Sequence, residues 1–302
     1  MNENKVVVLL STYNGEKYIK EQLDSILNQI YKNIKIIVRD DGSTDNTVQI
    51  LKEYNNDGKI ILYIGNNIGH VKSYYWLLEN SEKADYYSFA DQDDIWFNYK
   101  IFNAVNALNY TGNEKPSLYF SDFDYCNKDL IFISHKKPLK LKINFYSVLL
   151  NNINWGFTSV INNKLRDMFL LMPSHENIPH DYLILFLGYF FGNIIYDKYR
   201  CAKHRIHDNN VSMSYFNFFK HQIWRIKNIL LSDDLNFKKR WISFLNIYNY
   251  ILTEEIKNEF KIYINVNNYF YYYIKKIFKN KRYRDELFDE IAIRFIFLIG
   301  RI

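Results

Sequence analysis

The sequence predicts an α/β protein with a mostly parallel sheet and flanking helices, followed by a helical C-terminal region. Two features predict this fold. In the first part of the chain, short apolar runs alternate with stretches whose apolar residues recur at helical spacing, as in repeated βα units. From about residue 212 onward, long helical patterns rich in Lys, Tyr and Phe replace this alternation.

The expected strands of the first part are nearly continuous apolar runs. This is usual for parallel strands that are buried on both faces. They cover residues 6–10, 34–38, 59–64 and 86–90. Parallel neighbours need right-handed crossover connections, and helical patterns fill the segments between these strands.

The first expected helix has apolar residues that recur from Ile19 to Ile30, and Asn14 is placed to cap it. Later elements are expected as a helix after the turn at 39–45, a helix at 71–79, a strand at 117–124, and helices at 145–150 and 181–191. We expect one domain over residues 1–211, with halves at 1–98 and 99–211, and a separate region over 212–302.

The composition is that of a globular protein, with 48% hydrophobic and 24% charged residues. The aromatic share of 18% is high, which fits an AT-rich coding bias and also surfaces that meet membranes or sugars. Cys126 and Cys201 form no disulfide or metal pattern, which indicates a reducing compartment. We expect a cytoplasmic protein with no signal peptide and no spanning helix.

Three polar clusters follow expected strands. They are Ser11-Thr12-Tyr13-Asn14, Asp40-Asp41 and Asp91-Gln92-Asp93-Asp94. Because ligands bind beyond the carboxyl ends of parallel strands, we expect the clusters to surround one crevice. Carboxylates one residue apart can hold Mg²⁺ or Mn²⁺, and such a cation can neutralise a diphosphate leaving group. The alternative for the acidic cluster is a solvated turn.

Several further residues admit both a functional and a structural interpretation. Tyr13 could stack on a base or cover the sheet edge, and Asp41 could bind a base or ribose or cap a helix. Asp181 could act as a general base or cap its helix, and His207 could bind a metal or lie in a polar loop. Gly15 stands alone after the first strand, which argues against a dehydrogenase or P-loop enzyme.

Six segments, in order over roughly the first 210 residues, resemble family 2 glycosyltransferases of the GT-A fold. They are VVVLLSTYNGEKYIKEQLDSILNQ, VRDDGSTDNT, NNIGHVKSY, FADQDDIWFNYK, HDY and HRIHDNNVS. The segment FADQDDIW with a late His-Asp pair is similar to bacterial rhamnosyltransferases that build capsule, O-antigen or cell-wall polysaccharides. The resemblance implies a nucleotide-sugar-binding half at 1–98 and an acceptor-binding half at 99–211.

The resemblance also implies residue roles. Nucleotide-binding residues would be Ser11, Thr12, Tyr13, Asn14, Asp40, Asp41, Lys72, Asp91 and Gln92. Asp93 would be the principal ligand of Mn²⁺ or Mg²⁺, with His207 and Asp91 beside it, and Asp181 would be the catalytic base. Donor or acceptor sugar contacts would come from Asp122, Trp155, Gly156, Thr158, His180 and Arg205.

The implied activity is inverting sugar transfer from a nucleoside diphosphate donor, best matched by dTDP-rhamnose, to a saccharide that is itself linked to a lipid. Asn98, Tyr182 and Asp208 stand where this group usually has Pro, Trp and Gly, which leaves donor and acceptor open. A transferase that uses a UDP-hexose is the first alternative. A non-catalytic nucleotide-sugar binder or scaffold is the alternative of another class.

The C-terminal third is basic. Residues 216–302 hold 16 Lys and Arg against 9 Asp and Glu, although the whole chain has a net charge of only +6. Within it, residues 269–284 combine six basic residues with aromatic ones. This pattern fits two interpretations equally well, a peripheral contact with the inner face of a bacterial membrane and a helical bundle or homodimer interface. No recognition motif for nucleic acid accompanies the charge.

Overall fold

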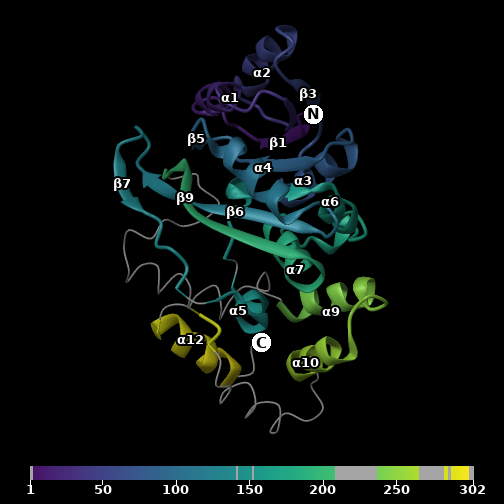
Figure 1. The fold of residues 1–302 in the computed structure, drawn as a ribbon. Coiled ribbons are helices and arrows are strands. Elements are labelled where there is room, and N and C mark those ends of the chain that lie inside the picture. Colours follow the sequence, from purple (N-terminus) through teal and green to yellow (C-terminus); the bar gives the residue numbers. More distant parts are fainter. Residues whose placement is uncertain are drawn as a thin grey trace. The chain divides into compact units, whose positions relative to one another are not determined.

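The computed structural model describes residues 3–140, 142–151, 153–207, 237–264, 282–284 and 287–298. The chain divides into two compact units. The first comprises Met1–Pro138 and Asn154–His207, and the second comprises Leu139–Ile153 and Asp208–Ile302. Figure 1 shows the elements of both units in the order of the chain.

Nine strands in the described part of the first unit form one sheet, in the order β3-β2-β1-β4-β8-β6-β9-β5, with β7 paired to β6. The strands are β1 (Val6–Thr12), β2 (Ile34–Asp40), β3 (Ile61–Ile64), β4 (Tyr86–Ala90), β5 (Ile95–Trp96), β6 (Ser117–Cys126), β7 (Phe132–His135), β8 (Val160–Asn162) and β9 (Asn193–Arg205). The pairs β1–β2, β1–β4, β2–β3 and β6–β9 are parallel. The short strand β8 joins the two parallel parts through antiparallel pairing with β4 and β6.

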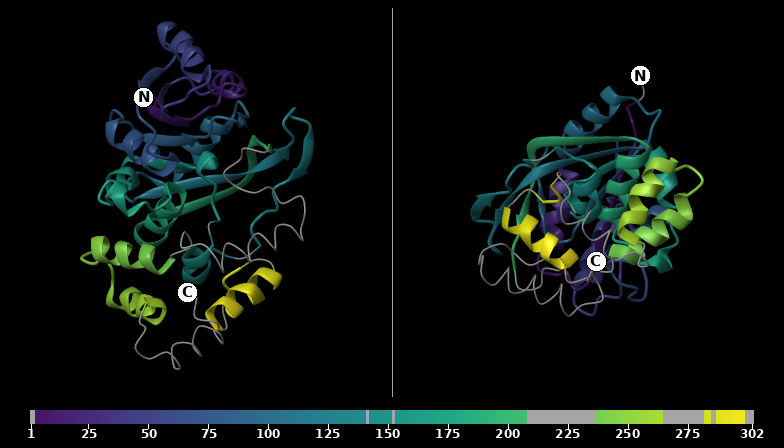
Figure 2. Two further views of the ribbon diagram at one scale, coloured as in Figure 1. Left: turned by 180° about the vertical axis from the view of Figure 1, so that it is seen from behind. Right: turned by 90° about the horizontal axis from the view of Figure 1, so that it is seen from below.

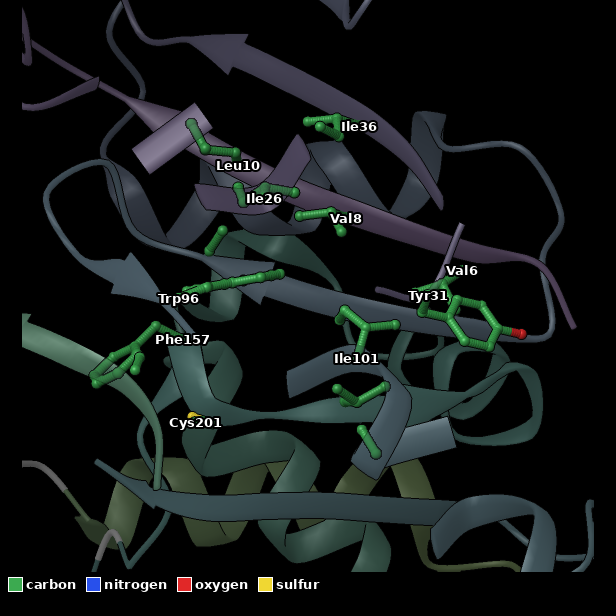
Figure 3. Close-up of a cluster of buried hydrophobic side chains, with 14 of the residues drawn as sticks. Val6, Val8, Leu10, Ile26, Tyr31, Ile36, Trp96, Ile101, Phe157 and Cys201 are labelled. Carbon is green, nitrogen blue, oxygen red and sulfur yellow. The ribbon is translucent and has the colours of Figure 1, made fainter. Parts of the chain in front are cut away.

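Helices cover the sheet on two sides. Side chains from α1 (Ile19–Leu27), α2 (Thr47–Asn56) and α4 (Lys100–Thr111) share one buried cluster with every second residue of β1. Figure 3 shows Val8 and Leu10 of β1 in this cluster with Trp96, Ile101 and Phe157. The remaining helices of this unit, α3 (His70–Asn80), α6 (Asn163–Phe169) and α7 (His180–Phe191), pack on one another and on the other side of the strands.

The long strand β9 runs beside β6, as Figures 1 and 2 both show. Its start is fixed at Gly192, where an added Cβ would overlap the carbonyl oxygen of Pro116. Only glycine lets the chain approach so closely that Asn193 N donates to Pro116 O at 2.9 Å. This contact sets the register with which β9 extends toward the other strand ends.

The structure contains every strand and helix that the periodicity predicts in the first unit. The main difference at the first helix is its N-terminus, because α1 begins at Ile19 and no side chain caps it. Asn14 instead adopts a left-handed conformation with φ 50°, so the predicted cap is wrong. The pattern did not predict α4 or β9.

The regular elements described in the second unit are all helices. It contains α5 (Phe145–Leu150), α9 (Phe237–Tyr248), α10 (Glu254–Ile264) and α12 (Leu287–Leu298). Aromatic rings hold it together, since Phe145 lies 5.3 Å from Phe260 and Trp241 lies 5.9 Å from Tyr263 between ring centroids. Residues 139–153, which we expected in the acceptor-binding half, thus group with the C-terminal helices.

Two predictions about the C-terminal region lie largely outside the described residues. These are the boundary at residue 211 and the basic segment 269–284, of which only residues 282–284 are described. Among the helices in the described ranges, none combines the length and apolar character that crossing a bilayer requires.

Lys100 is an ionisable residue in the core of the first unit, with 1% of its surface exposed. Its ammonium donates to the carbonyl of Phe157 and lies 3.4 Å from the centroid of the Trp96 ring. Burial lowers the pKa of Lys100 to about 8, although Cys201, Asp94 and Asp91 oppose this. The side chain therefore joins α4 to η1 (Gly156–Thr158) at an electrostatic cost.

We predict that Lys100→Met changes the pH dependence of stability. The pKa of Lys100 falls from 10.5 to about 8 on folding, so between these values the unfolded chain binds more protons than the folded chain. Wild type should therefore gain stability relative to the variant as pH rises through this window, by roughly 3 kcal/mol in total. Urea unfolding of both proteins at several pH values measures the difference, and a constant difference would contradict the prediction.

Candidate functional site

The loops that follow β1 and β4 are joined by one side chain. Gln92 accepts from the backbone N–H of Tyr13 at 2.8 Å and donates to its carbonyl oxygen at 3.1 Å. Gly15 makes room for this pairing, because a Cβ there would overlap the Gln92 amide. The Tyr13 backbone is thus fixed, while 46% of the residue stays exposed.

The loops after β1 and β2 are joined in a similar way. Asp40 is fully buried and accepts from Thr12 Oγ1 at 2.9 Å and from the backbone N–H groups of Gly42 and Ser43. Asn14 Oδ1 accepts from the Thr44 N–H at 2.8 Å. Carboxylate and amide oxygens therefore fix the turn that leads into α2.

Asp41 fixes the loop between β3 and α3. It forms a buried ion pair with Arg39 and accepts from the backbone N–H groups of Ile68 and Gly69, each at 2.9 Å. Ser11 donates to Ser73 of α3 at 2.8 Å, which brings the end of β1 to the same place. Lys72 directly precedes Ser73 in the same helix, and its side chain is exposed.

The three acidic residues after β4 have three different partners. Asp91 accepts from the hydroxyl of Tyr74 at 2.8 Å. Asp93 Oδ2 lies 2.9 Å from His207 Nε2. Asp94 is fully buried, with Oδ1 at 2.8 Å from His204 Nδ1 and 3.2 Å from the backbone nitrogen of Arg205. The cluster is therefore joined to the end of β9.

Burial and mutual repulsion shift the ionisation of this cluster. Although part of Asp91 is exposed, close protein packing raises the pKa of its carboxyl to about 7, and the carboxylates of Asp94 and Asp93 add to the shift. Burial lowers the pKa of His204, but Asp94 and the other two carboxylates raise it by more. Burial also raises the pKa of Asp94, although His204 opposes this shift, so His204 and Asp94 form one coupled buried pair.

Arg205 and His207 follow His204 and are held by the acidic loop and α1. The Arg205 guanidinium donates to the carbonyl oxygens of Asp93 and Lys128 and pairs with Glu21. It also lies 4.4 Å from the ring of Tyr18, on which His207 packs at 4.8 Å. Arg205 thus holds the acidic loop against α1, and Tyr18 contacts both Arg205 and the His207 ring.

Asp93 and His207 supply an oxygen and a nitrogen that could bind a divalent cation. No group of three or more His, Cys, Asp and Glu suited to a metal occurs among the residues described. Mg²⁺ and Mn²⁺ sites in proteins often use one or two side chains, with water and substrate phosphates as the other ligands. The donor set at this position fits such a site.

His180 and Asp181 open α7 beside α3. The His180 ring lies 4.0 Å from Tyr74 and 4.8 Å from Phe89, and neither ring nitrogen has a hydrogen-bond partner within the described residues. Burial lowers the pKa of His180 to about 4, so the imidazole is neutral. Asp181 is half-buried and accepts from the Tyr182 N–H at 2.8 Å. His180 therefore connects α7 to the Tyr74 that contacts Asp91.

The other predicted sugar contacts form two groups. Gly156 packs against His180, and Thr158 is buried and donates to the carbonyl of Trp155 at 2.8 Å. The Trp155 ring lies 5.4 Å from His204, beside the acidic loop. Asp122 belongs elsewhere, because its buried carboxylate accepts from Lys136 and Tyr196, each at 2.7 Å.

The structure thus brings the predicted residues of β1, β2, β4 and β9 to one edge of the sheet, connected by hydrogen bonds. Sequence reasoning did not single out Tyr74 and Glu21, and it gave no separate role to Asp94 or His204, although these four residues hold the others there. Asp94 directly precedes the apolar pair Ile95-Trp96, which is a signal of burial that the sequence does contain.

Comparisons with known proteins bear on this site. A family model described as Glycosyl transferase family 2 matches residues 7–163. An uncharacterized glycosyltransferase of Rickettsia typhi is 30% identical over 217 residues, which cover 70% of this chain and 67% of that protein. The dTDP-rhamnosyl transferase RfbG of Shigella flexneri is 42% identical over 105 residues, or 33% of this chain and 36% of that protein. The chain thus spans about two thirds and one third of these relatives.

Solved structures share the fold. TarS of S. aureus in complex with UDP has a TM-score of 0.57 at 18% identity, over 86% of this chain and 70% of that chain. The mannosyltransferase PcManGT from Pyrobaculum calidifontis, in complex with GDP-Man and Mn²⁺, has a TM-score of 0.53 at 15% identity, over 82% and 65%. These similarities concern the fold and confirm the predicted α/β class of the GT-A type.

We predict that Gly156→Ala destabilises the protein through a clash with His180. A Cβ at residue 156 would overlap the imidazole, which Tyr74 and Phe89 hold in place. The cost should be about 1–3 kcal/mol in wild type and close to zero in a His180→Ala background. Urea unfolding of the four proteins of this cycle measures the coupling, and an equal cost in both backgrounds would rule out the clash.

Proposed function

The chain belongs to glycosyl transferase family 2, and from this premise we propose that it transfers a sugar from a nucleoside diphosphate to a saccharide hydroxyl, with inversion at the anomeric carbon. One observation carries the proposal. Asp93 and His207 meet at 2.9 Å on the edge of the sheet where the loops after β1, β2 and β4 also meet. This edge is the usual ligand position in open α/β sheets.

A divalent cation, Mn²⁺ or Mg²⁺, would be held by Asp93 and His207, with Asp91 nearby. When bound, it would neutralise charge on the diphosphate leaving group. Asp93 is itself held through its carbonyl by Arg205, and His207 rests on Tyr18, so both donors have fixed positions. Such preorganisation is what a binding site for a charged leaving group requires.

Nucleotide binding is assigned to the residues around Tyr13. Its partly exposed ring is free to stack on a base, because Gln92 fixes only its backbone. Asp41 would accept from base or ribose groups, and Asp91 would support the cation or the donor sugar. The exposed Lys72 would approach the diphosphate. Ser11, Thr12, Asn14 and Asp40 act through the loops that they hold together.

Asp181 is our candidate for the catalytic base. Inverting transfer needs a carboxylate that removes the proton of the acceptor hydroxyl as its oxygen attacks the anomeric carbon. Asp181 lies at the N-terminus of α7, half-buried and next to His180. The His180 ring packs against Tyr74, whose hydroxyl donates to Asp91. The acceptor would lie along Trp155, Gly156 and Thr158, since Gly156 also touches His180.

The proposed donor is dTDP-rhamnose, and the proposed acceptor is a lipid-linked saccharide of a bacterial surface polysaccharide. The stretch of 42% identity to the dTDP-rhamnosyl transferase of Shigella flexneri supports this donor. A UDP-hexose is the second candidate, because the fold is shared with TarS, which has been solved with UDP-GlcNAc at 19% identity and a TM-score of 0.52.

We predict that dTDP-rhamnose with Mn²⁺ raises the Tm more than other nucleotide sugars do. A ligand that binds only the folded state at about 100 times its Kd stabilises it by roughly 3 kcal/mol. Thermal unfolding with dTDP-rhamnose, UDP-glucose, UDP-galactose, UDP-GlcNAc and GDP-mannose ranks the donors. A larger shift with a UDP-sugar would replace the proposed donor, and no shift with any of them would contradict nucleotide-sugar binding.

We predict that Asp93→Ala and Asp181→Asn each abolish transfer for different reasons. Asp93→Ala should also abolish the Mn²⁺-dependent part of the Tm shift, whereas Asp181→Asn should keep it, because the base acts after the donor is bound. Loss should be about 10²-fold or more in kcat. Asp57→Ala and Asp57→Asn are matched controls, since Asp57 is an exposed partner of Lys59. Activity that survives both substitutions and chelation of metal would refute the assignment.

A further inference from the structure

A groove with unused polar and aromatic groups lies between α4 and β9, which pack against each other. Its volume is about 560 Å³, and its lining residues are Tyr99, Asn103, Asn106, Asp197 and Tyr199. All five belong to the first unit. None is assigned to the nucleotide, the cation or the base. The groove therefore shares no lining residue with the site described above.

A local irregularity in β9 builds one wall of the groove. Ser121 of β6 pairs with Asp197, but the next residue, Asp122, pairs with Arg200. Two residues of β9 therefore lack partners on β6, and Tyr199, one of these two, is 71% exposed. Such bulges redirect side chains out of the regular ladder.

Asp197 is fixed within this wall. One carboxylate oxygen accepts from the Tyr119 hydroxyl at 2.8 Å, and the other accepts from the Tyr199 N–H at 2.9 Å. The first bond connects the groove to the core, because Tyr119 is buried. Each carboxylate oxygen can accept a further hydrogen bond, so Asp197 can still receive a hydroxyl from a ligand.

The opposite wall comes from α4. Tyr99 is its N-cap residue, and Asn103 and Asn106 are three residues apart, so they lie on one face of the helix. Each amide offers two N–H donors and one carbonyl acceptor. The two walls together present two phenol rings, two amides and one carboxylate.

The chemistry of the lining selects a class of ligand. None of the five lining residues is basic, which disfavours phosphates and other anions. Aromatic faces next to amide and carboxylate groups suit a ligand that is apolar on one face and rich in hydroxyls at its edge. Saccharides have this character, since their C–H faces stack on aromatic rings and their hydroxyls both donate and accept.

We propose that this groove is a second carbohydrate-binding site, which holds a neutral saccharide chain away from the reaction centre. The assignment to a saccharide rather than another polyol rests on the proposed function. A transferase that extends a saccharide gains effective concentration when a second site on its surface holds the same chain. The groove would thereby favour long acceptors over short ones.

Calorimetric titration of the full chain with maltotetraose, cellotetraose, chitotetraose and a tetrarhamnoside tests the site. We expect at least one probe to bind with a Kd below roughly 10 mM, and Tyr199→Ala to weaken it about tenfold or more. The double variant N103A/N106A should weaken it several-fold. Tyr110→Ala is the matched control, because Tyr110 is on α4, is 95% exposed and does not line the groove. It should bind as wild type does.

Saturating UDP and Mn²⁺ should leave the Kd of the saccharide unchanged, since the two sites are separate. Binding that survives Tyr199→Ala, binding that UDP abolishes, or no binding of any probe would overturn the proposal. The Asp93→Ala protein separates this proposal from the proposed function. If the Asp93→Ala protein binds the saccharide while wild type shows no transfer with any donor, the second binding site is supported and the transferase assignment fails.

Discussion

The buried carboxylate of Asp94 is the constraint on which the site depends. A fully buried carboxylate is stable only with a charged or hydrogen-bonding partner, and here His204 and the backbone nitrogen of Arg205 provide both. Because Asp94 adjoins Asp93, and His207 is three residues beyond His204, the pairing of Asp94 with His204 also brings the two candidate cation ligands together. Arg205 completes the arrangement by binding the Asp93 carbonyl and Glu21 of α1.

The same principle applies to the other strand ends. Asp40, Asp41 and Gln92 lie at or just after strand ends, and each accepts from the backbone of one loop. Gln92 binds the loop after β1, Asp40 the loop after β2, and Asp41 the loop after β3. Polar side chains that family resemblance assigns to the nucleotide therefore also fix the loops that surround it. This dual role explains why so many polar groups can be buried here, since each one removes an unsatisfied donor or acceptor from a loop.

The sequence predicted the first half of the fold well, because continuous apolar runs such as that of β1, alternating with helical patterns, are typical of parallel strands that are buried on both faces. It also placed Tyr13, Asp41 and Asp93 at strand ends, which needs no tertiary information. It did not predict β9, whose half-exposed, charged residues and shifted register lack a regular alternation. The role of Asp94 was equally out of reach, because its partner is distant in the chain and only the fold brings the two together.

The link between Asp94 and His204 spans 110 positions in the chain. Closing so long a loop costs conformational entropy, and such distant contacts form slowly. During translation the strand ends of β1, β2 and β4 leave the ribosome well before β9 does, so the neighbouring carboxylates of the acidic loop remain without His204, Arg205 and His207. The candidate site is therefore completed only after β9 has been synthesised, and a chain interrupted before β9 carries an acidic loop whose buried carboxylate lacks its distant partner.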